Sequence, residues 1–167
     1  WNVVFDKDTV PCKQISMVDD SREAIFLAMK YFGWDAKQIT AKQLKQIEGL
    51  FVEQKEWVGA YTDFQQSYFL TSKTYPLVVS QRERIVRTML IDEDLAFIVP
   101  DEGSLMILTN VVICASSKKD ELIYQFLNYI YDHDVMISNC KEFCILPVVK
   151  DVLEVLPQEY IGVADLL

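Results

Sequence analysis

Short β-branched runs and segments with a helical pattern alternate along this chain, and their order restricts the fold more than any other feature. Residues 14–18 alternate like a strand, and residues 21–32 then place apolar side chains at helical spacing until Gly33. Further strand patterns occupy residues 57–61, 75–79 and 95–99. Strands that alternate with helices indicate an α/β fold with a largely parallel sheet.

Helix starts can be read from capping-box patterns, in which a Ser or Thr is followed three residues later by Glu or Gln. Thr40 and Gln43 predict a helix to about residue 54, and Ser80 and Glu83 predict another to about residue 90. The segment between them, residues 62–74, is expected to be irregular with one short helix. In the last third we expect an extended run at 105–114 and helices at 117–131, 134–143 and 148–156.

Size and charge exclude some classes of protein. The 167 residues can form one sizeable core, and the longest apolar run, 105–115, is too short and too polar to span a bilayer. The net charge of −9 argues against nucleic acid as a partner, because such binding needs a basic surface. An acidic surface suits a cationic ligand, although acidity also keeps many proteins soluble.

Catalytic and metal-binding motifs are not found. Four cysteines (Cys12, Cys114, Cys140 and Cys144) lack metal-ligand spacing and are expected to be buried thiols. Asp132 and Asp134 flank His133, the single histidine, and this triplet predicts a polar helix boundary. Without a glycine-rich phosphate loop or a nucleophile motif, we expect no cofactor and no enzyme.

Acidic side chains follow two of the predicted strands. Asp20 and Glu23 lie where the first strand gives way to a helix, which is where open α/β sheets bind ligands. The same spacing is typical of a helix cap, which is the commoner role, and the two roles are compatible. Asp63 follows Tyr61 and Thr62 at the end of the next strand, where an aromatic face beside a carboxylate would suit a cation, although a solvated loop is the commoner role of such residues.

A set of short motifs also occurs in a recognisable order. The chain opens with W-N-V-V-F at 1–5 and has D-D-S-R-E at 19–23, P-D-E-G at 100–103 and Y-Q-F-L-N-Y-I at 124–130. This set resembles the spermidine/putrescine-binding family of bacterial extracellular solute-binding proteins, which serve ABC importers. The resemblance covers the second lobe and the C-terminal portion of a family member. It implies a lobe of the type II periplasmic-binding-protein-like fold, with a mostly parallel sheet flanked by helices.

The resemblance also implies a domain organisation. Residues 1–104 would form the second of two lobes that close over a solute. Residues 105–167 would hold a crossing strand and C-terminal helices that return toward a first lobe, which we expect to be absent from this sequence.

Binding residues follow from the resemblance position by position. Asp20 and Glu23 match acidic contacts of the family, and Asp63 matches a small polar contact. Gln81 stands where the family has tryptophan. Further on, Ile107 and Thr109 stand where the family has a tryptophan and an aspartate that face the ligand. The site is therefore predicted to include Asp20, Glu23, Asp63, Gln81 and Thr109, with altered ligand specificity.

These implications define the expected function. We expect the solute-binding component of an ABC-type importer for a small cationic solute such as putrescine or spermidine. Its partner would be the transporter permease, and its location periplasmic or extracytoplasmic, associated with the membrane through the transporter. The alternative is a ligand-sensing or partner-binding module of the same fold, either a regulatory effector domain or a degenerate paralogue. The isolated chain is also expected to self-associate, because the surface that meets the first lobe would be uncovered.

Overall fold

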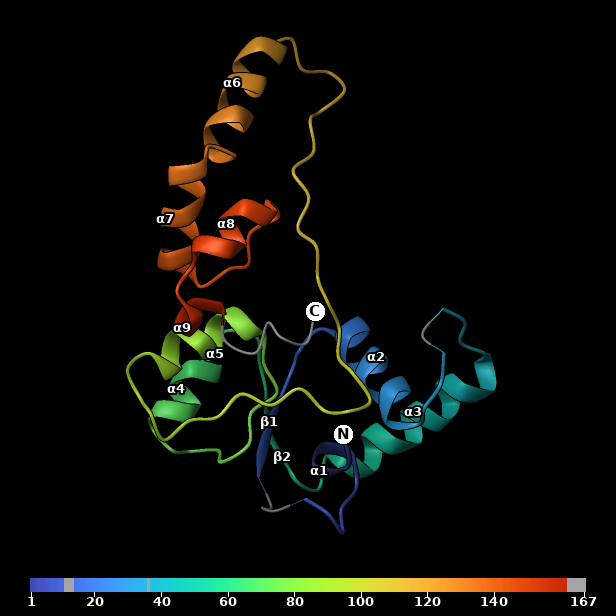
Figure 1. Ribbon diagram of the computed structural model, residues 1–167. Helices are drawn as coiled ribbons and strands as arrows, with labels where there is room; N and C mark the ends of the chain where they lie inside the picture. The colour runs from blue at the N-terminus through green and yellow to red at the C-terminus, as the bar shows by residue number, and fades with distance from the viewer. Residues whose placement is uncertain (11–13, 36, 162–167) are drawn as a thin grey trace.

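The computed structural model describes residues 1–10, 14–35 and 37–161, and these form a lobe with a long arm (Figure 1). We call residues 1–104 the lobe and residues 105–157 the arm. Two strands are assigned in the lobe, β1 (Ile15–Met17) and β2 (Val58–Tyr61), and they pair in parallel. Helices α2 and α3 lie on one side of this pair and α4 and α5 on the other (Figure 1).

Strand β1 is the centre of the small sheet. Every residue of β1 is buried, as expected for a strand covered on both faces. On one edge it pairs with β2, and on the other Ser16 forms a parallel bridge to Val78. The strand predicted at 75–79 is therefore reduced to one bridge. Pro76, which lacks a backbone N–H, lies just before it and shortens the ladder.

The strand predicted at 95–99 is wrong, since this stretch has no assigned secondary structure. Pro100 ends the run, and Ile98 is 77% exposed, so the apolar pattern finds no sheet edge on which to pack. The following turn is formed as expected: the amide of Gly103 donates to the carbonyl of Pro100 at 2.8 Å.

Helices α2 (Ser21–Tyr31) and α3 (Ala41–Gln54) follow the predicted pattern closely. Gly33, at a positive φ of 68°, ends α2, and the amide of Trp34 donates back to the carbonyl of Met29 at 2.9 Å. Thr40 and Gln43 form the predicted capping box of α3.

Helices α4 (Gln66–Thr71) and α5 (Arg82–Met89) confirm the expected short and longer helices of this region. The capping box predicted for α5 is wrong. Its N-cap is Gln81 rather than Ser80, and no side chain within the described ranges caps the helix.

The lobe core is built around β1, α2 and α3. It contains the buried side chains of Val4, Phe5, Ile15, Met17, Val18, Ala24, Leu27, Ala28, Met29, Ile47, Trp57 and Val79. Helix α1 (Asn2–Phe5) was not predicted. It is held against the core because Gln54 Nε2 and Trp57 Nε1 both donate to the carbonyl of Val4, at 3.1 and 3.0 Å.

The arm consists of an extended segment at 105–114, as predicted, followed by helices. These are α6 (Asp120–Ile130), α7 (His133–Phe143) and α8 (Lys150–Val155), and α9 (Gln158–Ile161) then follows beside α5 (Figure 1). A second, small core of Met136, Cys140, Val152 and Leu156 joins α7 to α8. Asp132 caps α7, which confirms the predicted helix boundary around His133.

The cysteines divide between these parts. Cys140 and Cys144 are buried free thiols, as expected, whereas Cys114 is exposed on the arm, contrary to the prediction. Its neighbours Val112 and Ile113 are exposed as well, so no core is present here to bury a thiol. Cys12 lies outside the described residues. None of the helices in the described ranges has the length and apolar character needed to cross a bilayer.

Much of the arm is apolar and exposed. Helix α6 buries none of its residues, and exposed large apolar side chains of the arm include Met106, Ile107, Leu108, Val111, Val112, Leu122, Tyr124, Phe126 and Tyr129. Residues 105–113 carry no charge, so the extended segment lacks the lysines and prolines that usually protect a free strand edge. An apolar surface of this extent normally marks an interface.

We therefore expect the isolated chain to self-associate through the arm, as a dimer or larger in sedimentation velocity. Val112→Lys should weaken this association about tenfold, because it places a charge on an apolar contact. Ile91→Lys is the matched control, since Ile91 is 81% and Val112 84% exposed, but Ile91 belongs to the lobe. A wild-type chain that is strictly monomeric at the same concentration would contradict this prediction.

Candidate ligand-binding site

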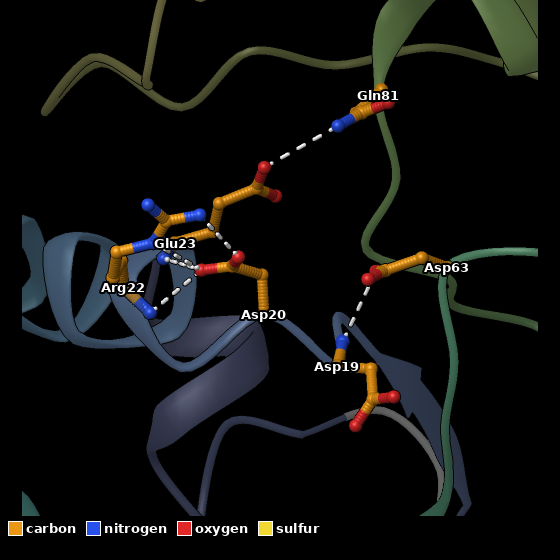
Figure 2. A network of polar contacts seen from close by, with 6 residues as sticks. All are labelled: Asp19, Asp20, Arg22, Glu23, Asp63 and Gln81. Atoms are coloured by element: carbon orange, nitrogen blue, oxygen red, sulfur yellow. Dashed lines mark hydrogen bonds and ion pairs between the residues drawn. The ribbon is translucent and has the colours of Figure 1, made fainter.

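The candidate site lies where the two parallel strands end. Strand β1 ends at Met17 and leads through Asp19 and Asp20 into α2, while β2 ends at Tyr61, two residues before Asp63. Parallel strands have their carboxyl ends at the same end of a sheet, so the acidic residues of both loops lie close together there. Asp63 Oδ1 accepts a hydrogen bond from the amide of Asp19 at 3.1 Å and ties the loops together (Figure 2).

Asp20 is the N-cap of α2. Its Oδ1 accepts hydrogen bonds from the amides of Arg22 and Glu23, at 2.8 and 3.2 Å, which satisfies two free N–H groups of the first turn. The guanidinium of Arg22 pairs with the same carboxylate, with Nη2 2.9 Å from Oδ2 (Figure 2). The Arg22 guanidinium, followed by these two amides, lowers the pKa of Asp20 to about 2. The Asp20 carboxylate thus accepts hydrogen bonds from its own helix and pairs with the exposed side chain of Arg22.

Glu23 is differently placed. Its side chain points from α2 toward α5, where Gln81 Nε2 donates to Glu23 Oε1 at 3.3 Å (Figure 2). Burial, followed by the negative charges of Asp63 and Asp20, raises the pKa of Glu23, and the hydrogen bond from Gln81 opposes this rise. Glu23 is therefore a half-buried carboxylate with acceptor capacity left for a cation.

An open hollow of about 380 Å³ lies over this carboxylate. It is lined by Asp20, Arg22, Glu23, Phe26, Leu105 and Ile107. One wall is charged and comes from the first turn of α2. The apolar part of the lining combines Phe26, one turn further along α2, with Leu105 and Ile107 of the arm. Such a hollow can hold an ammonium group at the charged wall and an aliphatic chain along the apolar part.

Four of the five predicted site residues line this hollow or lie beside it. Asp20 and Glu23 line the hollow, Gln81 contacts Glu23, and Asp63 holds the adjoining loop. Thr109 does not line it. It is exposed on the extended segment, which runs away from α2 (Figure 1).

Arg22, Phe26 and Leu105 line the hollow but were not predicted as site residues. Phe26 stands three residues after Glu23 and so shares its helix face, and Leu105 stands two residues before Ile107 on one face of an extended segment. This spacing could have identified both apolar residues.

Known proteins show where this architecture occurs. No family model matches the chain. Over 144 residues it is 24% identical to a putrescine/cadaverine-binding protein of Pseudomonas aeruginosa, across 79% of this chain and 40% of that protein. It is also similar to the substrate-binding protein PotD of a spermidine/putrescine ABC transporter from Streptococcus pneumoniae, with a TM-score of 0.77 and 17% identity. That match covers 97% of this chain and 50% of PotD.

The chain has a periplasmic-binding-protein fold. The predicted resemblance is confirmed, since the sequence relative is named as a putrescine/cadaverine-binding protein and the structural neighbour as a spermidine/putrescine ABC transporter substrate-binding protein. The similarity to the structure of PotD confirms the predicted fold class. The chain spans half the length, or less, of the two proteins it matches.

Proposed function

We propose that the chain is the second lobe and the C-terminal portion of a solute-binding protein that delivers a small cationic solute, such as putrescine or spermidine, to an ABC-type importer. The observation that carries this proposal is Glu23, a half-buried carboxylate that lines a hollow together with apolar side chains. Both named relatives are binding proteins, which supports a role in binding rather than catalysis.

The contacts of the site limit how many amines this lobe can hold. The Asp20 carboxylate already pairs with Arg22 and two amides, so Glu23 is the better acceptor for an ammonium group. Phe26, Leu105 and Ile107 would contact the methylene chain beside it. One amine is therefore held at Glu23, and a second amine of a diamine would need another acceptor.

The arm supports the two-lobe part of the proposal. According to this proposal, residues 1–104 form the second lobe. The apolar residues of the arm then pack against a first lobe that lies outside this sequence. An extended segment that is apolar on both faces is typical of a central strand of a sheet. The chain covers only 40% of one relative and 50% of the other, which leaves length for such a lobe.

The partner and location follow from the same proposal. A solute-binding protein of this type would work outside the cytoplasm and reach the membrane through the transporter permease. The alternative, a regulatory or partner-binding module of the same fold, gains no support from the two named relatives.

Calorimetry on the protein that joins this chain to its first lobe tests the function. Putrescine, cadaverine and spermidine should each be titrated, with the uncharged diol 1,4-butanediol as the control for the apolar chain alone. We expect heat of binding with at least one amine and none with the diol. No heat with any of the three amines at millimolar concentration would remove the polyamine assignment.

A further inference from the structure

Arg82, the first residue of α5, is a half-buried cation, and among the described residues its hydrogen bonds go to main-chain oxygens of the C-terminal segment. Nη1 donates to the carbonyl of Cys144 at 2.7 Å, and Nη2 donates to that of Ile161 at 2.7 Å and also to that of Tyr160. Its Nε is buried with no partner in the part of the chain that the structure describes. The guanidinium therefore acts through its two terminal nitrogens.

The carbonyls that Arg82 binds lie at helix ends. Cys144 is the C-cap of α7, with a positive φ of 54°, and Tyr160 and Ile161 end α9. The last carbonyls of a helix have no partner within it and carry the negative end of its dipole, so a guanidinium suits them. Burial lowers the pKa of Arg82, but an arginine remains charged. Its removal would leave three carbonyls without this donor.

A neighbouring contact between α5 and α7 is much weaker. Arg87 Nη2 lies 3.7 Å from Glu142 Oε1, and both side chains are about two-thirds exposed, at 63% and 66%. Ion pairs of this kind contribute little to stability. Arg87 is therefore a natural control for Arg82, since it is the same residue type, on the same helix, facing the same part of the chain.

The residue before Arg82 contacts the candidate site. Gln81 donates to Glu23 at 3.3 Å, while Arg82 donates to Cys144 and Ile161. Two consecutive residues in the first turn of α5 thus face two different parts of the molecule. Because the two residues are adjacent at the start of α5, we expect a shift of one contact to affect the other.

We propose that the start of α5 links the C-terminal helices to the acidic hollow. The hydrogen bonds of Arg82, which we call the clasp, hold the ends of α7 and α9 against the lobe. The hydrogen bond of Gln81 to Glu23, which we call the tie, couples this clasp to the hollow. Loosening the Gln81–Glu23 contact then favours opening of α7 and α9 away from α5. A solute that displaces Gln81 from Glu23 would act in the same way. That last consequence rests on the proposed function, whereas the clasp and its tie to Glu23 do not.

Cys140 and Cys144 report on the opening, since both thiols are buried at the base of α7 with 0% and 1% exposure, while Cys114 is exposed and serves as an internal reference. Alkylation of each thiol in the unliganded chain should be followed by mass spectrometry of its peptide. We expect Arg82→Met to speed alkylation of Cys140 and Cys144 about tenfold or more, because it removes several charge-assisted hydrogen bonds. Arg87→Met should change it less than about twofold.

Global unfolding must be separated from opening of the clasp. Hydrogen exchange provides this, because α2 and α3 should keep their protection in Arg82→Met while α7 and α9 lose theirs. Arg82→Lys, which keeps the charge but not the fork of donors, should show an intermediate effect. Equal thiol reactivity in Arg82→Met and Arg87→Met, with unchanged exchange in α7 and α9, would overturn the clasp.

The tie to the hollow is tested by removing either partner of the Gln81–Glu23 hydrogen bond. Gln81→Ala and Glu23→Ala should each raise Cys140 and Cys144 alkylation about threefold, and the double variant should raise it no further, because all three lose the same hydrogen bond. Additive effects, or an effect of Gln81→Ala alone, would overturn the tie. Neither experiment requires a solute, so failure here is distinct from failure of the proposed function.

Discussion

Phe5→Ala is expected to destabilise the lobe by about 3–5 kcal/mol, the usual cost of removing a buried phenylalanine ring. Phe5 is 2% exposed, and its ring centroid lies 5.4 Å from that of Tyr31 and 6.3 Å from that of Phe51. The ring therefore joins α1 to α2 and α3. Its loss would also loosen the Val4 carbonyl that Gln54 and Trp57 share.

Urea unfolding followed by tryptophan fluorescence measures this loss. Val3→Ala is the matched control, because Val3 belongs to the same short helix but is 42% exposed. Its effect should stay within about 0.5 kcal/mol, as for most surface substitutions. If both variants unfold at the same urea concentration, the ring of Phe5 does not hold α1 in the core.

Local chemistry made several helix boundaries predictable. The side chains of Asp20 and of the Thr40–Gln43 pair make the hydrogen bonds that cap α2 and α3. The residues that predict these helix starts are therefore the ones that stabilise them. Gly33 is similar, because its positive φ is the feature that ends the helix. The Ser80–Glu83 pattern failed because the N-cap is Gln81 and the helix begins at Arg82, and these two residues are engaged in tertiary contacts.

The strands were less predictable because a strand needs a partner. The run at 75–79 meets β1 only at its end, and the run at 95–99 meets no edge, so β-propensity without pairing gave no strand there. The arm shows that a helix, unlike a strand, can be predicted even where it has no packing partner. Helix α6 formed with the predicted amphipathic pattern, yet none of its residues is buried.

Some residues of the site were predictable from local sequence patterns, and others depend on the tertiary structure. The positions of Asp20, Glu23 and Asp63 followed from strand ends, a rule of topology that a sequence pattern can reveal. The pairing of Arg22 with Asp20 depends on a side-chain rotamer, and the wall formed by Leu105 and Ile107 depends on where the arm leaves the lobe. Neither is encoded in a local motif. Thr109 was placed by resemblance alone, and the arm carries it away from the hollow.

Glu23→Gln is expected to weaken binding of putrescine, in the protein that includes the first lobe, by about 1.5–2 kcal/mol. This is roughly a 10- to 30-fold rise in Kd, taken from the lower part of the range for a charge-assisted hydrogen bond because the carboxylate is partly exposed. Glutamine keeps the shape and one oxygen for Gln81 but removes the charge that an ammonium group needs. Calorimetry at pH 7 measures the change.

Asp20→Asn is the matched control, because asparagine caps a helix as well as aspartate and the Asp20 charge is already paired with Arg22. It should change Kd less than Glu23→Gln does. In the wild type, affinity should fall as the pH is lowered through the raised pKa of Glu23, because protonation removes the charge that binds the amine. Asp20, with a pKa of about 2, stays ionised through that range. If Asp20→Asn proved the more damaging substitution, the amine would be held by the helix cap rather than by Glu23.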